Sequence, residues 1–244
     1  MYFKILKFKL QHLIDNRLHI GHKKKNLTKK MNSYSFGFRH NVTILDLRKT
    51  LWSLNYLFYN LTELFYYRNN IFFIETQGNI PLQSIMENFK TNHLILSNNF
   101  IKNAGFIQQQ WIRGLLSNWK VVFETFQQKT TSNSKQSLRW HNSLKGLKSK
   151  MNHPLLPDFL FICNIDQTLG LKEIVKSKLP LMGLVDSNMN PEFFLYPFLG
   201  NNDSIESIKF CFSLLLLSQK ESMIQERKTL YYLVLLKIKH FLKK

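Results

Sequence analysis

Acidic residues are scarce in this chain, which has 15 aspartates and glutamates against 34 lysines and arginines in 244 residues. The formal net charge of +19 and the pI near 9.9 are extreme for a soluble enzyme of this size. The charge is also uneven, at +10 for residues 1–50, +6 for 120–153 and +5 for 220–244. A polyanion such as nucleic acid would neutralise these segments. The composition therefore predicts a folded scaffold that presents cationic segments to a polyanionic partner.

Cysteines and long hydrophobic runs are scarce as well. Cys163 and Cys211 are far apart in apolar runs, which favours burial in a reducing compartment over a disulfide framework. The longest uncharged apolar stretches, Phe210–Leu217 and Leu230–Leu236, are shorter than the roughly 18–20 residues of a membrane span. No secretory signal is visible, and the first motif begins at His19, which leaves little room for a cleavable transit peptide.

Motifs for nucleotide binding and catalysis are missing. The sequence contains no GxGxxG, GxxxxGK[ST], GxSxG, HExxH or CxxC pattern. The loop after the apolar run Ile71–Ile74 begins with Glu75, whose carboxylate would repel phosphate. We therefore expect no enzymatic activity.

Two groups of residues could carry other chemistry. His19 and His22 are spaced as metal ligands on a helix would be, but Gly21 argues against a continuous helix there. A packing or phosphate-contacting role is favoured, and no metal site is expected. Three aspartates occur at expected strand ends or helix starts, where capping explains them better than acid–base catalysis does. They are Asp166, Asp186 and Asp203.

Strands alternate with helices along the chain, which predicts a parallel sheet covered on both faces. The expected strands are Ser35–Arg39, Val42–Leu45, Ile71–Ile74, Phe106–Gln108, Phe159–Cys163 and Leu181–Val185. The expected helices are Phe3–Asn16, Leu115–Lys129, Leu169–Lys178, Ile205–Ser218 and Glu221–Leu242. A further helix is expected to run from the N-cap Asp46 to Tyr67, and another to start at Pro81. Asn202 or Asp203 is the expected cap of Ile205–Ser218.

The domain organisation follows from these elements. We expect an N-terminal helix in residues 1–18 and an α/β core in residues 19–126 and 153–218. The polar segment 127–136 is expected to be a flexible connection and Leu138–Lys150 a basic helical segment, while 219–244 is expected to form a basic amphipathic C-terminal extension.

A lysine-rich segment, residues 23–30, has five lysines in eight positions. A solvated loop is the simplest alternative, but histidines and aromatic residues on both sides favour RNA, since such surfaces contact phosphates and stack on bases. A second candidate is the segment from Trp111 to Lys120, for which core packing of two tryptophans is an equal alternative. The residues predicted to bind RNA are His19, His22, Lys23, Lys24, Lys25, Lys29, Lys30, Tyr34, Arg39, Arg48, Trp111, Arg113, Asn118 and Lys120.

Residues 19–50, HIGHKKKNLTKKMNSYSFGFRHNVTILDLRKT, resemble the N-terminal signature of the small-subunit ribosomal protein S2 family without a gap. Trp111–Lys120 is similar to that family's tryptophan-rich motif. Leu156-Pro157-Asp158, Leu179-Pro180, Val185-Asp186-Ser187-Asn188 and Gly200-Asn201-Asn202-Asp203 follow its C-terminal half in order. The chain departs from the pattern at Leu27-Thr28-Lys29 and Glu75-Thr76-Gln77, and in about ten extra residues around 91–103.

The resemblance implies a flavodoxin-like or Rossmann-like three-layer domain with a projecting helical hairpin, here shortened to residues 127–152. It implies small-subunit rRNA and neighbouring ribosomal proteins as partners, on the solvent side between head and body. It implies no small-molecule substrate and no cofactor beyond the structural Mg²⁺ of the rRNA.

The frequent Phe, Tyr, Ile, Asn and Lys have AT-rich codons, which indicates an AT-rich genome, and organelle genomes are a common source of this bias. We expect a mitochondrial ribosome, with a plastid ribosome as the alternative. Two rivals remain. One is a nucleotide-using enzyme of the doubly wound class, and the other is a peripheral membrane protein held by its C-terminal helix.

Overall fold

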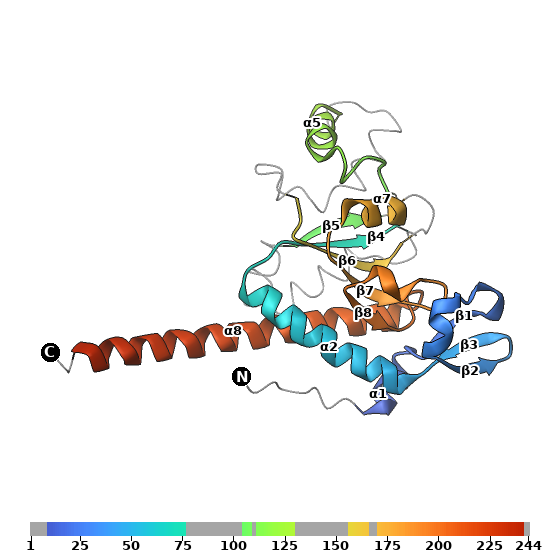
Figure 1. Cartoon of the computed structure of the whole chain (residues 1–244), viewed down its shortest axis with the longest axis horizontal. Coiled ribbons are helices and arrows are strands. Elements are labelled where there is room, and N and C mark those ends of the chain that lie inside the picture. The colour runs from blue at the N-terminus through green and yellow to red at the C-terminus, as the bar shows by residue number, and fades with distance from the viewer. Residues whose placement is uncertain (1–8, 77–103, 109–110, 130–155, 166–169, 242–244) are drawn as a thin grey trace.

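A five-stranded parallel sheet forms the centre of the protein (Figure 1). The computed structural model describes residues 9–76, 104–108, 111–129, 156–165 and 170–241. The sheet contains β4 (Ile71–Glu75), β5 (Ala104–Gln108), β6 (Phe159–Asn164), β7 (Leu181–Val185) and β8 (Tyr196–Leu199), in the order β5-β4-β6-β7-β8 with every neighbouring pair parallel. Counted along the chain this order is 2-1-3-4-5, as in doubly wound folds.

The strands are buried on both faces, as an alternating βα pattern requires. In β4, Ile71 and Phe73 belong to one hydrophobic cluster while Phe72 and Ile74 belong to the other. Successive side chains of a strand point to opposite faces, so each strand supplies both clusters. The sequence-based expectation of an α/β fold with helices on both faces of a parallel sheet is confirmed.

Helices α2 (Leu47–Tyr66) and α8 (Ile205–Phe241) cover one face of the sheet. Asp46 caps α2 as predicted, because its carboxylate accepts a hydrogen bond of 2.9 Å from the backbone N–H of Arg48. The buried leucines Leu54, Leu57, Leu61 and Leu64 recur at helical spacing and turn one side of α2 to the core.

Helix α7 (Gly170–Ser177) and the turns from residue 111 to α5 (Trp119–Lys129) cover the opposite face. The helix expected from Leu115 begins instead at Trp119, because a set of tight turns bonded to α7 occupies residues 113–118. A left-handed residue, Gly114 at φ +81°, stands in these turns.

A small antiparallel sheet, β1-β3-β2, lies beside the main sheet at the end of the molecule nearest the start of α2 (Figure 1). β2 (Ser35–Arg39) and β3 (Val42–Leu45) have the predicted bounds. β1 (Ile20–Lys23) and β8 were not predicted, because Gly21 in β1 and Pro197 in β8 are residue types that argue against a strand interior.

The two predicted C-terminal helices form one continuous helix, α8, of 37 residues. Ser218 and Ser222, which interrupt the apolar pattern, each bond a backbone carbonyl three residues back and remain in the helix. Its N-cap is Ser204, whose hydroxyl accepts from the N–H of Ser207 at 3.1 Å, and not Asn202 or Asp203. No helix in the described part of the chain is long and apolar enough to cross a membrane.

Several predictions fall outside the described residues. These are residues 3–8 of the helix Phe3–Asn16, the helix starting at Pro81, the insertion around 91–103, most of 127–152, and Asp166. In the described part of the first of these, the helix is α1 (Leu10–Asp15) and Lys9 before it is extended. Cys163 and Cys211 are buried and unpaired, as predicted. Burial raises the pKa of both thiols.

Candidate nucleic-acid interface

The small antiparallel sheet positions the lysine-rich segment. β2 and β3 are joined by His40 and Asn41, both left-handed at φ 46° and 64°, as a two-residue hairpin turn requires. Val42 pairs with Arg39 on one side and with Lys23 on the other. The sheet therefore brings Arg39 and the start of the lysine run to the same end.

Six basic residues of this region are exposed, and we call them the hairpin surface. They are Lys23, Lys24, Lys25, Lys29, Lys30 and Arg39. The ammonium group of Lys24 lies 4.8 Å from the ring centre of Phe38, a cation–π distance. Lys30 forms an ion pair with Glu192 of the loop before β8, so its charge is partly neutralised.

Aromatic side chains stand among these cations. Phe36 is 74% exposed and Phe38 46% exposed, although both belong to a strand. Tyr34 is half-buried, and the ammonium group of Lys49 lies 5.7 Å from its ring centre. Exposed rings beside lysines provide stacking surfaces for unpaired bases next to contacts for phosphates.

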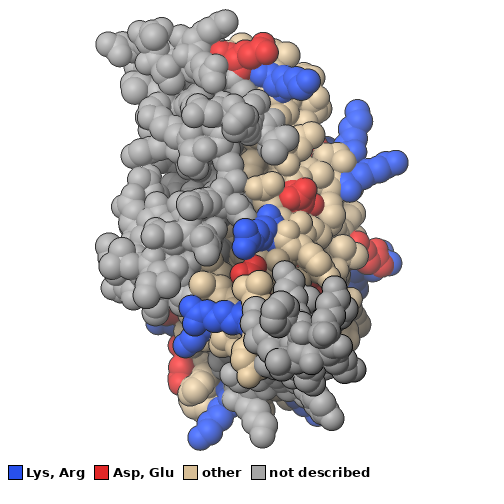
Figure 2. All heavy atoms as spheres, turned by 90° about the vertical axis from the view of Figure 1, so that its left-hand side faces the viewer, with Lys and Arg blue, Asp and Glu red and all other residues tan. Residues whose placement is uncertain are grey.

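The opposite end of the molecule has a different charge distribution. Figure 2 faces the end away from the small sheet and shows Lys and Arg side chains separated by acidic ones. On that face the described basic residues form no continuous patch. The hairpin surface differs from this face in that its six exposed basic residues lie within the short segment 23–39.

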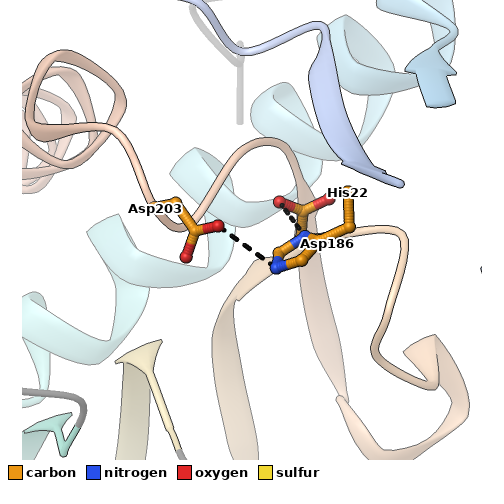
Figure 3. Close-up of side chains that lie close together, drawn as sticks. All are labelled: His22, Asp186 and Asp203. Atoms are coloured by element: carbon orange, nitrogen blue, oxygen red, sulfur yellow. Dashed lines mark ion pairs between the residues drawn. The ribbon is translucent and has the colours of Figure 1, made fainter. Parts of the chain in front are cut away.

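His22 connects the small sheet to the main sheet (Figure 3). Its Nδ1 lies 3.1 Å from an oxygen of Asp186, just after β7, and its Nε2 lies 3.1 Å from an oxygen of Asp203, before α8. Its backbone N–H donates to the hydroxyl of Ser187 at 2.8 Å. Both ring nitrogens are thus engaged inside the protein, so His22 is positioned to join the two sheets and not to contact a phosphate.

The pKa of His22 is raised by these carboxylates. The hydrogen bond with Asp186 is the largest cause, burial opposes it, and the charges of Asp186 and Asp203 add to the rise. Asp186 is buried and also accepts from the N–H groups of Ser187 and Asn202. The prediction that Asp186 and Asp203 cap helices was therefore wrong. The two carboxylates instead lie on either side of the His22 imidazole.

The same three residues offer the donor types that a divalent cation binds. One ring nitrogen and two carboxylate oxygens lie within 4.8 Å of one another. Each ring nitrogen faces its own carboxylate, whereas a cation would need one nitrogen and both carboxylates on the same side. As placed, the imidazole lies between the two carboxylates, and a cation would require the side chains to turn.

Gly21 makes this junction possible. A Cβ atom at Gly21 would lie 2.8 Å from the hydroxyl oxygen of Ser187 and 3.0 Å from a carboxylate oxygen of Asp186. Only a residue without a side chain allows β1 to approach the end of β7 so closely.

The tryptophan-rich segment is held by Glu173 of α7. Its carboxylate accepts hydrogen bonds from the indole N–H of Trp111 at 2.9 Å and from the backbone N–H groups of Gly114, Leu116 and Ser117 at 3.0, 3.0 and 3.2 Å. Trp111 and Trp119 are 8% and 5% exposed. Their rings pack in the core and are not available for stacking on bases.

Burial would raise the pKa of Glu173, but the hydrogen bonds from Trp111 and the three N–H groups outweigh it and hold the pKa below its usual value. Replacing Glu173 by glutamine should lower the free energy of unfolding by about 2 kcal/mol at neutral pH, since the amide cannot accept all of these bonds. Because the pKa of Glu173 is lower in the folded protein than the value of 4.5 in the unfolded protein, ionised Glu173 stabilises the fold above pH 4.5. This stabilisation is lost as the pH falls through the lower pKa of the folded protein.

Urea denaturation of wild type and Glu173→Gln between neutral and acidic pH measures this effect. The difference between the two proteins should shrink as the pH falls. Glu124→Gln, at an exposed position of α5, is the control and should change little. An undiminished difference at acidic pH would contradict the assignment.

The remaining predicted residues occupy two other places. Arg113, Asn118 and Lys120 are exposed around the turns that Glu173 holds. Arg48 is exposed in the first turn of α2, and its Nε lies 3.6 Å from Asp46. His19 is half-buried with its Nδ1 enclosed, and burial lowers its pKa. The structure therefore places Lys23 and Arg39 at the same end of the small sheet, whereas Arg48 belongs to α2 and the tryptophan segment packs against α7.

Sequence reasoning missed Asp186, Asp203 and Glu173 as functional partners. An aspartate directly after a buried strand was a signal for Asp186, because the carboxyl ends of parallel strands gather side chains at one edge. Nothing local to Glu173 distinguishes it from an ordinary acid in the first turn of a helix.

Comparison with known proteins agrees with this arrangement. The family model described as "Ribosomal protein S2" matches residues 13–222. The "Small ribosomal subunit protein uS2" of Rickettsia rickettsii is 27% identical over 231 residues, covering 86% of this chain and 74% of its own. The protein of the same name from Endomicrobium trichonymphae is 26% identical over 220 residues, covering 82% and 84%. The matched residues include both sheets, the turns held by Glu173 and the ion pair of His22. Because the family model matches most of the chain, the chain belongs to the ribosomal protein S2 family.

Proposed function

We propose that this chain is a non-catalytic structural component of a small ribosomal subunit that binds rRNA through the hairpin surface. The observation that best supports this function is the match of residues 13–222 to a family of ribosomal proteins. The exposed lysines beside exposed Phe36 and Phe38 supply the physical means of contact. Neighbouring small-subunit proteins are the second class of partner, and no small-molecule substrate or cofactor of its own is part of the proposal.

The mode of recognition follows from the residue types. Lysine is a mobile point charge, so it positions a backbone without reading bases. The hairpin surface has five lysines and one arginine, which favours recognition of folded RNA by shape. The exposed residues Arg113, Asn118 and Lys120 supply a second contact. His19, His22 and Trp111 are left out of the proposed interface because their rings are engaged or buried.

The finer features of the fold belong to the same proposal. The strand order supports a flavodoxin-like domain. A shortened hairpin in 127–152 is retained as an expectation from the family resemblance. The mitochondrial setting rests on the AT-rich residue bias alone.

Gradient sedimentation of an organellar lysate tests the function. The protein should travel with small-subunit rRNA, and it should still follow that rRNA when a magnesium chelator alters the particle. If the protein stays at the top of the gradient while the rRNA sediments, the structural role in the subunit is wrong. Sedimentation with rRNA from a non-organellar fraction instead would overturn only the mitochondrial setting.

Replacing Lys23, Lys24 and Lys25 by alanine should weaken binding to small-subunit rRNA and flatten its salt dependence. Each lost phosphate contact should remove about one unit from the slope of log K against log salt, so about 2–3 units in all. Binding of labelled rRNA fragments over a series of salt concentrations measures this slope.

A matched control removes the same charge elsewhere. Lys172, Lys176 and Lys209 are exposed positions of α7 and α8, and their triple alanine variant should keep the wild-type slope within about one unit. If both triple variants lose the same slope, binding is a property of net charge and not of the hairpin surface.

A further inference from the structure

Helix α2 carries two aromatic side chains on its solvent side. Trp52 is 69% exposed and Tyr56 is 44% exposed, although the leucines of the same helix are buried. The two residues are four positions apart, which makes them neighbours on the surface of a helix. Their ring centres are 5.7 Å apart and their planes differ by 7°, so the rings are stacked. We call these two side chains the aromatic pair.

The main sheet holds the aromatic pair in place. The ring of Tyr196, in β8, meets the ring of Tyr56 edge to face at a distance of 5.5 Å between ring centres. The backbone N–H of Leu199, also in β8, donates to the hydroxyl of Ser53 at 3.1 Å and fixes α2 against this edge strand. The rings are therefore positioned before a partner arrives, and a rigid aromatic surface loses little conformational entropy on binding.

Trp52 has one ring face covered and one face free. Within the part of the chain that the structure describes, Tyr56 is the only ring stacked on Trp52, no cation lies over the indole, and the indole N–H donates to no residue. A single exposed apolar side chain is ordinary on a protein surface, but adjacent rings held in a fixed orientation are typical of a binding face.

The free charges beside the aromatic pair are positive. Arg48 lies one turn before Trp52 on the same side of α2, and both Arg48 and Lys49 are exposed. The nearby acids are already engaged: Asp46 caps α2 and lies 3.6 Å from the Nε of Arg48, and Glu63 accepts a hydrogen bond from a tyrosine one turn earlier. The charge of this face therefore favours a partner that is negative beside the rings.

Lys49 connects this face with the lysine-rich segment. Its ammonium group donates to the backbone carbonyl of Ser33 and lies 5.7 Å from the ring centre of Tyr34. Both residues belong to the 3₁₀-helix η2 (Lys29–Tyr34), which contains two lysines of the hairpin surface. The proposed RNA-binding surface therefore continues to the first turn of α2, next to the aromatic pair.

We propose that Trp52 stacks on an unpaired base of RNA, with phosphates of the same strand at Arg48 and Lys49. The inference rests on the proposed RNA-binding function and adds a site for single-stranded RNA. Flat aromatic faces beside basic side chains bind single strands in this way. A base inside a duplex has both faces covered by its neighbours, so only an unpaired base can use the free face of Trp52. An exposed tryptophan can also anchor a protein partner, and the experiment separates that case.

Binding of the full-length chain to a labelled RNA strand of about twelve nucleotides tests this inference. The strand is used alone or annealed to its complement, and fluorescence anisotropy measures both affinities. Trp52→Ala removes the ring, and Trp52→Phe keeps a smaller one. The matched control is Tyr67→Ala, because Tyr67 is also 69% exposed but follows the opposite end of α2. Thermal unfolding of the variants should match wild type, since the replaced side chains are exposed.

Trp52→Ala should weaken binding of the single strand about tenfold, as expected for one lost stacked base, and should change binding of the duplex by less than about twofold. Trp52→Phe should recover most of the lost affinity, and Tyr67→Ala should bind like wild type. The slope of log K against log salt should keep its wild-type value in Trp52→Ala, because stacking releases no counterions.

Several results would overturn the inference. Unchanged binding of the single strand by Trp52→Ala would leave the aromatic pair as a contact for a protein partner. Equal losses for the single strand and the duplex would show that Trp52 does not distinguish an unpaired base. An equal loss in Tyr67→Ala would show that the effect is not specific to the aromatic pair. These three results leave the proposed function standing, whereas a wild type that binds neither RNA would overturn that function and this inference with it.

Discussion

Replacing Gly183 by alanine is expected to destabilise the protein by about 4 kcal/mol, a large part of the roughly 5–15 kcal/mol that holds a domain folded. Gly183 lies in the middle of β7 at φ +138°, a conformation that a residue with a side chain rarely adopts. A Cβ atom there would lie 2.0 Å from the carbonyl oxygen of Ile162 in the neighbouring strand β6. Backbone atoms cannot move aside as a flexible side chain can, so the two strands must separate.

Separation of β7 from β6 should also disturb the ion pair of His22, because β7 ends at Val185 and the next residue is Asp186. Urea denaturation should show a lower midpoint for Gly183→Ala or no cooperative transition. Gly37→Ala is the matched control, since nothing described lies within 4 Å of its added Cβ atom, and it should shift the free energy of unfolding by less than about 0.5 kcal/mol. Equal effects at the two positions would mean that the packing of β7 against β6 does not require glycine at position 183.

Removing the imidazole of His22 should cost about 3 kcal/mol, because His22→Ala leaves the buried carboxylate of Asp186 without its positive partner. The effect should depend on pH. The pKa of His22 is raised above its ordinary value of 6.5, so the stabilisation is complete below pH 6.5 and is lost as the pH rises through the higher pKa of the folded protein. The difference in stability between wild type and variant should therefore be larger in mildly acidic buffer than at alkaline pH.

Chemical denaturation at a series of pH values, with a chelator in every buffer, measures this difference. Subtracting the variant from the wild type removes the contributions of all other titrating groups. His12→Ala, at an exposed position of α1, is the control and should follow the wild type at every pH. A difference that grows toward alkaline pH would show that neutral His22 is the stabilising form.

The local patterns of the sequence predicted most of the elements. Asp46 specified the start of α2, the pair His40-Asn41 the turn between β2 and β3, and the apolar runs around Phe73, Phe161 and Leu184 the buried strands. These signals work because caps, tight turns and strand periodicity depend on residues only a few positions apart. The predicted break near Ser218 was wrong, since a serine can bond its own helix and leave it intact.

Distant pairings could not be predicted from such patterns. His22 lies 164 positions before Asp186, and Glu173 lies 62 positions after Trp111. Only the packing of β1 against the end of β7, and of α7 against the tryptophan turns, brings these groups together. Even the chemical type was misleading, because an aspartate that could cap a helix and one that pairs with a histidine look the same in sequence.

The sequence by itself determined the strong positive charge, the absence of nucleotide motifs, the α/β class and the family resemblance. These properties are carried by composition and by short segments. The tertiary structure decided which residues form a surface. It exposed Lys23, Lys24 and Arg39 together, turned Trp111 into the core, and enclosed His22 between two carboxylates. Burial and ion pairing are properties of the neighbours that folding supplies, so the side chains with the richest chemistry were the ones whose roles only the fold could assign.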